Sequence, residues 1–159
     1  MISLRDIQTA ARDVIASAPY FSNEPIGPAE LVVADEGLSK DDIENALNTR
    51  GLAVVVDFPL QAQVMHRTSG ATHCYVTVPV HVQLNPVANA SDNGAHKSIL
   101  LAVDEVLNAF MENNPGDDEA DRFEIEYDAI DLILNDAGLV AYVLWLRKLC
   151  VFAPMEIEV

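Results

Sequence analysis

The sequence predicts an α+β domain in which two long hairpins form an antiparallel or mixed sheet and helices pack on one of its faces. Apolar residues recur at helical spacing in three segments and alternate with polar residues in others. In chain order these segments are helix, short strand, helix, two strands, helix and two strands. This order lacks the repeated strand–helix–strand units of a doubly wound parallel sheet. The 159 residues suit a single domain over 1–159.

Three segments have the spacing of an amphipathic helix. The first begins at Ser3, with Asp6 three positions later as in a capping box, and Pro19 is expected to end it. Gly51 follows the second segment and suits the position after a helix. Asn114-Pro115-Gly116 is expected to stop the third. The predicted helices cover residues 3–17, 40–50 and 95–113.

Residues 73–84 are the clearest strand, because apolar and polar residues alternate there over about a dozen positions. With a preceding strand at 52–66 they predict a long hairpin. Pro59 and Pro79 lie within these two strands. Since proline donates no ladder hydrogen bond, Pro59 is expected at a bulge or an edge, and Pro79 at an edge or with its backbone nitrogen toward solvent. The other predicted strands are 30–34, 122–134 and 139–152, with a hairpin turn at 135–138 and a polar loop at 86–94.

The charge balance excludes several classes of partner. Nine Lys and Arg stand against 25 Asp and Glu, a formal net charge of −16. Sequence-independent nucleic-acid binding and binding to anionic lipid both need clustered basic residues. Charged residues interrupt the N-terminal segment, and polar residues interrupt the uncharged run 68–90, so neither a signal peptide nor a membrane span is expected. We therefore expect a soluble protein folded in a reducing cytoplasm.

Acidic residues are concentrated in 117–131, which holds eight acids and Arg122 as its only base. The spacing of an EF-hand loop is absent. From Phe123 onward the acids alternate with apolar residues, so they should form one face of a strand. This face is interpreted as a solvated surface or as an interface or lumen wall, with catalysis a further alternative. The candidate residues of the lumen or interface face are Asp117, Asp118, Glu119, Asp121, Glu124, Glu126 and Asp128.

No catalytic, metal or cofactor site is expected. His73 and His81 are eight residues apart, too far for one ion along a strand that rises about 3.3 Å per residue. His66 could lie opposite His73, but two histidines lack the further ligands that zinc needs. Cys74 and Cys150 are interpreted as core thiols, because the chain offers little positive charge to stabilise a thiolate. Nucleotide-binding and hydrolase motifs are absent.

The order and length of these elements resemble a known family. An N-terminal helix leads to a hairpin whose alternating strand closes on Asn85-Pro86, then to one long helix and a last strand with the pattern G-L-x-x-Y-x-L-x-L. This arrangement is similar to that of the tail terminator, or tail completion, proteins of long-tailed bacteriophages. The predicted helix at 40–50 departs from it. The segments that carry the likeness are Ile7–Ala18, Leu52–Val56, Cys74–Pro86, Lys97–Asn113 and Gly138–Leu146.

The resemblance implies a structural virion protein of the tail or neck, assembled in the host cytoplasm, rather than an enzyme. Such a protein forms a homo-oligomeric, hexameric ring that ends the tail tube and joins it to head–tail connector or stopper proteins. DNA would pass through the ring without specific binding, because an acidic wall repels phosphate. The alternatives are another phage neck or head–tail completion protein, an acidic inhibitor or DNA mimic, and a small-molecule enzyme.

Overall fold

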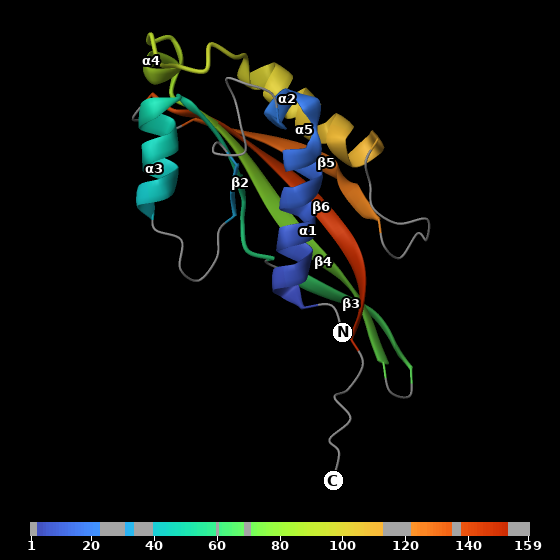
Figure 1. Ribbon diagram of the computed structural model, residues 1–159. Coiled ribbons are helices and arrows are strands. Elements are labelled where there is room, and N and C mark those ends of the chain that lie inside the picture. Colours follow the sequence, from blue (N-terminus) through green and yellow to red (C-terminus); the bar gives the residue numbers. More distant parts are fainter. Residues whose placement is uncertain are drawn as a thin grey trace.

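The computed structural model describes residues 3–22, 31–33, 40–59, 61–68, 71–112, 122–134 and 138–152. The predicted helices and strands appear in the predicted order, together with two short helices that the sequence did not indicate (Figure 1). The helices are α1 (Leu4–Ser17), α2 (Pro19–Ser22), α3 (Lys40–Thr49), α4 (Pro86–Asn89) and α5 (Ile99–Glu112). The strands are β1 (Leu31–Val33), β2 (Leu52–Val56), β3 (Gln61–Thr68), β4 (Ala71–Leu84), β5 (Phe123–Leu134) and β6 (Val140–Phe152).

The described strands form one six-stranded sheet in the order β1-β2-β4-β6-β5, with β3 also paired to β4. β1 runs parallel to β2, and every other pairing is antiparallel. β4 is long enough to pair with β6 along one side and with both β2 and β3 along the other. The predicted α+β class with an antiparallel sheet is confirmed. The strand predicted at 52–66 is instead two strands, β2 and β3.

The two prolines explain this division. Pro59 lies between β2 and β3 and not within one strand. Pro79 is buried in the central strand β4, so its predicted place at an edge or facing solvent is wrong. The backbone N–H of Asp57 donates to the carbonyl of Pro79 at 2.9 Å. The N–H and C=O groups of one strand residue point to the same side of the strand. The nitrogen of Pro79 therefore faces the gap between the end of β2 and the start of β3, where no ladder hydrogen bond is needed.

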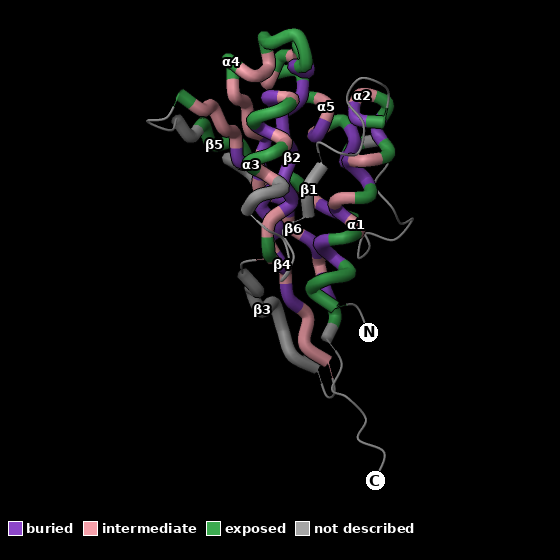
Figure 2. Tube along the Cα trace, turned by 60° about the vertical axis from the view of Figure 1, so that its left-hand side comes forward, coloured by how far each residue is buried: buried purple, intermediate pink, exposed green. Residues whose placement is uncertain are grey.

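One face of the sheet carries the main hydrophobic core. Alternate residues of β2, β4 and β6 point to this face, where α1 and α5 pack against the sheet (Figure 1). Apolar side chains at helical spacing on α1 complete the same core, and the side-chain amide of Gln8 donates to the carbonyl of Val56 at 3.0 Å. Purple segments in Figure 2 mark this buried layer. Its largest buried side chains are Ile7, Ile15, Phe21, Leu52, Leu144 and Leu146.

α3 contacts β2 and buries a second, smaller apolar group. Ala53 and Val55 alternate with the core residues of β2 and therefore point to the other face, yet both are buried, as is Leu47 of α3. α3 ends at Thr49, and Gly51 just beyond it has the positive φ of 77° expected after a helix. A Cβ on Gly51 would lie 2.1 Å from the backbone nitrogen of Asn89, so this glycine lets α3 and α4 approach closely.

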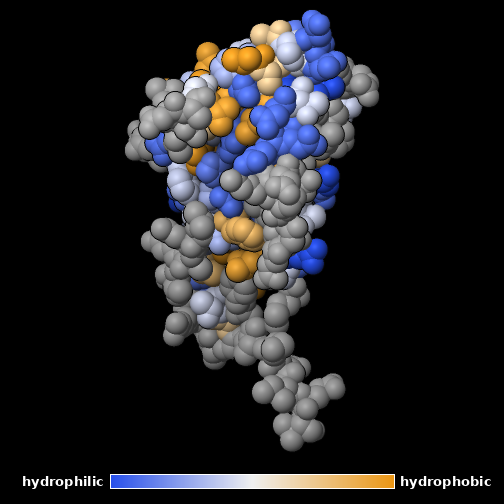
Figure 3. Space-filling view, turned by 90° about the vertical axis from the view of Figure 1, so that its left-hand side faces the viewer, coloured by the Kyte–Doolittle hydropathy of each residue, from blue (hydrophilic) through white to orange (hydrophobic). Residues whose placement is uncertain are grey.

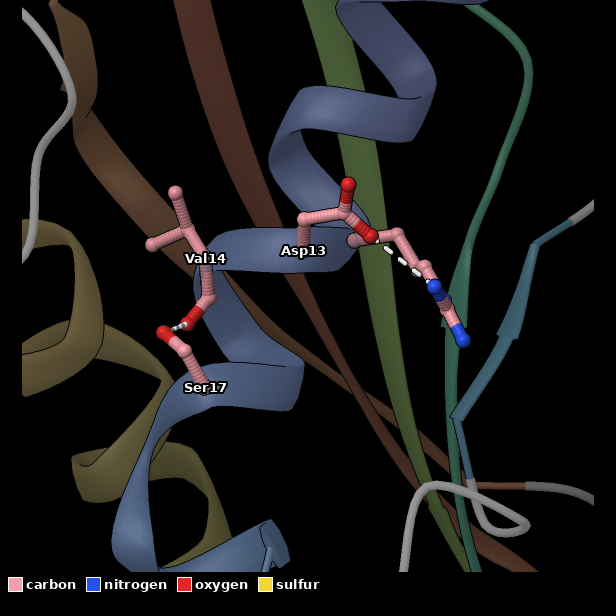
Figure 4. Close-up of polar contacts among 4 residues, drawn as sticks. Asp13, Val14 and Ser17 are labelled. Atoms are coloured by element: carbon pink, nitrogen blue, oxygen red, sulfur yellow. Dashed lines mark hydrogen bonds and ion pairs between the residues drawn. The ribbon is translucent and has the colours of Figure 1, made fainter.

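The ends of α1 are stabilised by local hydrogen bonds. Asp6 and Ser3 form the predicted capping box, each side chain accepting from the other residue's backbone N–H at 2.9 and 3.1 Å. Near the other end the hydroxyl of Ser17 donates to the carbonyl of Val14 at 2.8 Å (Figure 4). Arg12 and Asp13 form an ion pair at 2.9 Å on the outside of the helix (Figure 4). The helix therefore begins and ends where its own polar residues satisfy the backbone.

The segment before α5 differs from the prediction. The expected polar loop contains the short helix α4, which Asn85 caps by accepting from the N–H of Ala88 at 3.2 Å. The predicted helix 95–113 begins only at Ile99. Residues 95–98 are held instead by Asn89, whose side chain bonds both the N–H and the carbonyl of Lys97, at 3.2 and 3.1 Å. A side-chain amide that replaces a helical turn in this way leaves no periodic signal in the sequence.

Candidate functional site

The face of β4, β6 and β5 opposite α1 and α5 collects the polar residues of these strands. Side chains alternate across a strand, so the residues between the core positions of β4 and β6 point to this side. Most of them are half-buried. We call this surface the open face. It consists of His73, Tyr75, Thr77 and His81 of β4, Trp145, Arg147, Leu149 and Val151 of β6, and Glu124, Glu126 and Asp131 of β5.

Two of the predicted acids meet on the open face. The carboxylate of Glu124 pairs with Arg147, with Nε and Nη2 each 2.7 Å from Oε2. The guanidinium of Arg147 also lies over the ring of Tyr75, 4.7 Å from its centroid. Glu126 accepts from the hydroxyl of Thr77 at 3.1 Å and so reaches past β6 to β4. Both carboxylates are thus directed inward across their own sheet.

Two further acids contribute to the same surface. The indole N–H of Trp145 donates to Asp131 at 3.0 Å. Nε2 of His81 lies 3.3 Å from Oδ2 of Asp57, which follows β2. With Glu124 and Glu126, four described carboxylates lie on or beside this surface, and one of them, Glu124, pairs with Arg147. We did not predict Asp131, Trp145 or Arg147 as site residues. The alternate residues of the last strand form a second face that includes the tryptophan, and this face could have indicated them.

The remaining candidate acids are not placed on this face. Asp117, Asp118, Glu119 and Asp121 lie outside the described residues, as does the side chain of Asp128. The predicted continuous alternation along β5 is wrong, because the register with β6 shifts between Ile125 and Ile130. Ile125 lies opposite Leu146 and Ile130 opposite Leu144, so both point to the core side although their numbers differ in parity. Extra residues in one strand of a pair produce this change.

The histidines are spread along the strands. His66 and His73 are backbone partners between β3 and β4, as predicted. Within the part of the chain that the structure describes, no group of three or more His, Cys, Asp or Glu residues is arranged to hold a metal ion. His96 lies on an exposed turn with a positive φ of 52°. His66 and His73 are therefore paired across two strands, but among the described residues no further ligand joins them.

The two cysteines are buried and free, in agreement with their interpretation as core thiols. They are also directly opposite each other in the β4–β6 register, a relation that the sequence did not indicate. Burial raises the pKa of the Cys74 thiol. It also raises the pKa of Cys150, to about 11, with a smaller contribution from Cys74. Thiols with raised pKa values are poor nucleophiles at neutral pH.

The open face offers negative charge more than reactive groups. Glu124, Glu126 and Asp131 each bond a neighbouring donor and do not converge on one point. General acid–base catalysis needs titratable groups held within hydrogen-bond reach of one reacting group. On the side of the molecule that carries α3 and α4, hydrophilic and hydrophobic groups are interleaved (Figure 3). The arrangement therefore suits an electrostatic role.

Comparison with known proteins does not assign this chain to a group. No protein-family model matches the sequence, and no curated protein matches it. Among the described helices, none has the length and apolar character required to cross a bilayer. Any function must therefore be inferred from the fold and from the chemistry of the open face.

Proposed function

We propose that this chain is a phage tail terminator, a structural virion protein whose copies form a hexameric ring. The ring ends the tail tube and joins it to the head–tail connector or stopper proteins. The observation that carries the proposal is the acidic open face on a sheet whose opposite face is occupied by its own core. The resemblance in element order, from the N-terminal helix to the last hairpin, indicates which ring-forming family this surface fits.

Charge explains how such a ring would treat DNA. Six copies carry 6 × (−16) = −96 formal charges. If the open face lines the lumen, each copy presents Glu124, Glu126, Asp131 and Asp57 against Arg147. Duplex DNA carries one negative charge per about 1.7 Å of its axis and is repelled by such a wall. The duplex would pass without being held.

Assembly is the first test. Light scattering on the purified chain should give a mass near 6 × 17.3 kDa, alone or in the presence of tail tubes. The tubes would be polymerised beforehand from a purified phage tail-tube protein. Electron microscopy should then show rings at one end of tubes that have stopped growing. Tubes that elongate at an unchanged rate, with no ring at either end, would overturn the proposal.

DNA passage is the second test, and it addresses the open face itself. Glu126→Lys and Asp131→Lys should make the ring retain duplex DNA in a gel-shift assay, with retention that falls as salt rises. Asp92→Lys changes the charge equally at an exposed position on the loop after α4 and serves as the control. Equal retention by the control and by the open-face variants would show that this face does not line the lumen.

A monomer that binds a basic DNA-handling enzyme would favour the inhibitor or DNA mimic instead. The wild-type chain should therefore be mixed with such an enzyme at low and at physiological salt. A mimic presents carboxylates spaced like phosphates, and its binding should weaken as salt rises. The ring proposal expects no such complex.

A further inference from the structure

β5 lies at one end of the sheet order, and its outer edge is the longest exposed edge in the described part of the chain. Within the described residues β5 pairs only with β6. An edge strand presents unpaired backbone N–H and C=O groups that can pair with another strand. Natural edges are protected by lysine, proline, bulges or inward-pointing charges. The twelve residues of β5 contain no lysine or proline, and the register shift lies before Ile130, so the edge is regular from Ile130 onward.

The sheet register identifies the backbone groups that point outward from β5. The carbonyl of Pro79 faces β2, so the alternate residues of β4 direct their backbone groups to β6. Carrying this alternation through β6 makes Asp131 a hydrogen-bonded partner of Val143. Ile130 and Leu132 flank Asp131, and their N–H and C=O groups therefore point away from β6. Together with Leu134, which has the same parity, these residues form the regular part of the outer edge, beyond the register shift.

Three acids of β5 have described side chains, and all three point away from this edge. Glu124 and Glu126 bond Arg147 and Thr77, and Asp131 bonds Trp145, so all three are directed back across the sheet. The side chains of Ile130 and Leu132 are 45% and 52% exposed. Aliphatic residues with outward backbone groups are the features that favour strand addition.

The same chain carries a strand that could pair with this edge. β3 has eight residues and pairs only with β4 among the described residues, on the side of the sheet away from β6 and β5. β1, at the end of the sheet order, has only three residues. β3 and β5 also lie toward different ends of the molecule, β3 near the N-terminus and β5 near α5 (Figure 1). The two edges are therefore different surfaces.

We propose that the outer edge of β5 pairs with the outer edge of β3 in a second copy of this chain. Contacts between unlike surfaces run head to tail and close into a ring when the rotation permits. Ring closure leaves neither edge free in any copy. This inference rests on the proposed function, which requires a ring. It identifies the contact between neighbouring subunits of that ring.

Repulsion between the copies opposes this pairing. Each chain carries a formal net charge of −16, and salt screens interactions between exposed charges over about 10 Å at 0.1 M. Backbone hydrogen bonds and aliphatic contacts at the β5 edge are much less sensitive to salt. Association should therefore strengthen as sodium chloride rises from about 0.05 to about 0.5 M.

A matched pair of variants tests the edge. Leu132→Lys places a charge on the outer edge of β5, whereas Leu101→Lys makes the same change at a leucine of α5 that is 55% exposed. In sedimentation equilibrium the first should weaken association by about tenfold or more and the second by less than about twofold. Leu132→Pro removes an outward N–H, restricts φ and replaces the leucine side chain. It should weaken association like Leu132→Lys, and circular dichroism checks that the fold is retained. Equal association of the Leu132 and Leu101 variants would overturn the inference.

Hydrogen exchange separates edge pairing from other contacts. On association the amides of Ile130 and Leu132 should become protected together with amides of β3. Protection of β5 alone would indicate a symmetric β5–β5 contact, and a hexamer with neither edge protected would use another surface. Both results overturn the inference and leave the ring intact. Protected edges in an assembly that does not stop tube growth would instead support the edge contact and reject the terminator function. A chain that stays monomeric at high salt and on tubes rejects the contact outright.

Discussion

The two faces of the β4–β6 pair are built from alternate residues of the same strands but are stabilised differently. On the core face Val78, Leu144 and Leu146 are fully buried beneath α1 and α5. On the open face Trp145 and Arg147 are half-buried and bond acids of β5. Burial of apolar area dominates folding, whereas exposed polar contacts contribute little. The open face can therefore carry function and change its charge without unfolding the sheet.

Truncation of the core face should have the largest effect. Leu144→Ala removes a side chain with no exposed area and should lower the free energy of unfolding by about 2–5 kcal/mol in urea titration. Leu101→Ala, at an exposed leucine of α5, should change it by less than about 0.5 kcal/mol. Similar losses for the two variants would contradict the assignment of the core to this face.

Alkaline pH should have the second-largest effect, because it lowers the free energy of unfolding through Cys150 on the core face. The folded state holds the pKa of Cys150 at about 11, above the ordinary value of 9.0 that applies after unfolding. The unfolded chain therefore releases this proton first, so the stabilisation is complete below pH 9 and is lost as pH rises to about 11. Wild type should lose up to about 2 kcal/mol more than Cys150→Ala over this interval. Parallel pH curves for the two proteins would show that the thiol is not responsible.

The hydrogen bond between Trp145 and Asp131 should matter less. Trp145→Phe keeps an aromatic ring and removes the N–H that donates to Asp131, so the free energy of unfolding should fall by about 1 kcal/mol. Because this is the only tryptophan, unfolding is best followed by circular dichroism. In the Asp131→Ala background the same substitution should cost less, and an unchanged cost would mean that packing of the indole is what stabilises the face.

The ion pair of Glu124 with Arg147 should have the smallest effect. Both side chains are partly exposed, so Glu124→Gln should lower the free energy of unfolding by at most about 1 kcal/mol at low salt. The difference from wild type should shrink in high salt, where Coulomb attraction is screened. A larger and salt-independent loss would place this pair among the determinants of folding and would weaken the contrast between the two faces.

Local patterns predicted much of this molecule. Alternation identified β4 and β6, helical spacing identified α1 and α5, and the pair Ser3 and Asp6 marked the start of α1. The acidic strand was also anticipated, and two of its residues, Glu124 and Glu126, do lie on one surface. These features depend on residues close in sequence, which periodicity reports directly.

Other features depend on partners that are distant in sequence. The register shift in β5 appears only when β6 is placed beside it, and it reverses which residues face the core. Pro79 looked like an edge residue but is buried, because β2 ends and β3 begins opposite its missing N–H. The contact of Thr77 with Glu126 across β6 is likewise invisible along the chain.

The sequence by itself determined the main helices and strands, their order, the acidic balance and the α+β class. Each follows from composition or from a period of two or about 3.6 residues. Only the tertiary structure decided which strands are neighbours, which acids meet Arg147 and Trp145, and that Cys74 lies opposite Cys150. The physical reason is that pairing between strands fixes both the register and the neighbours of each strand. Neither can be deduced from patterns among residues that are close in sequence.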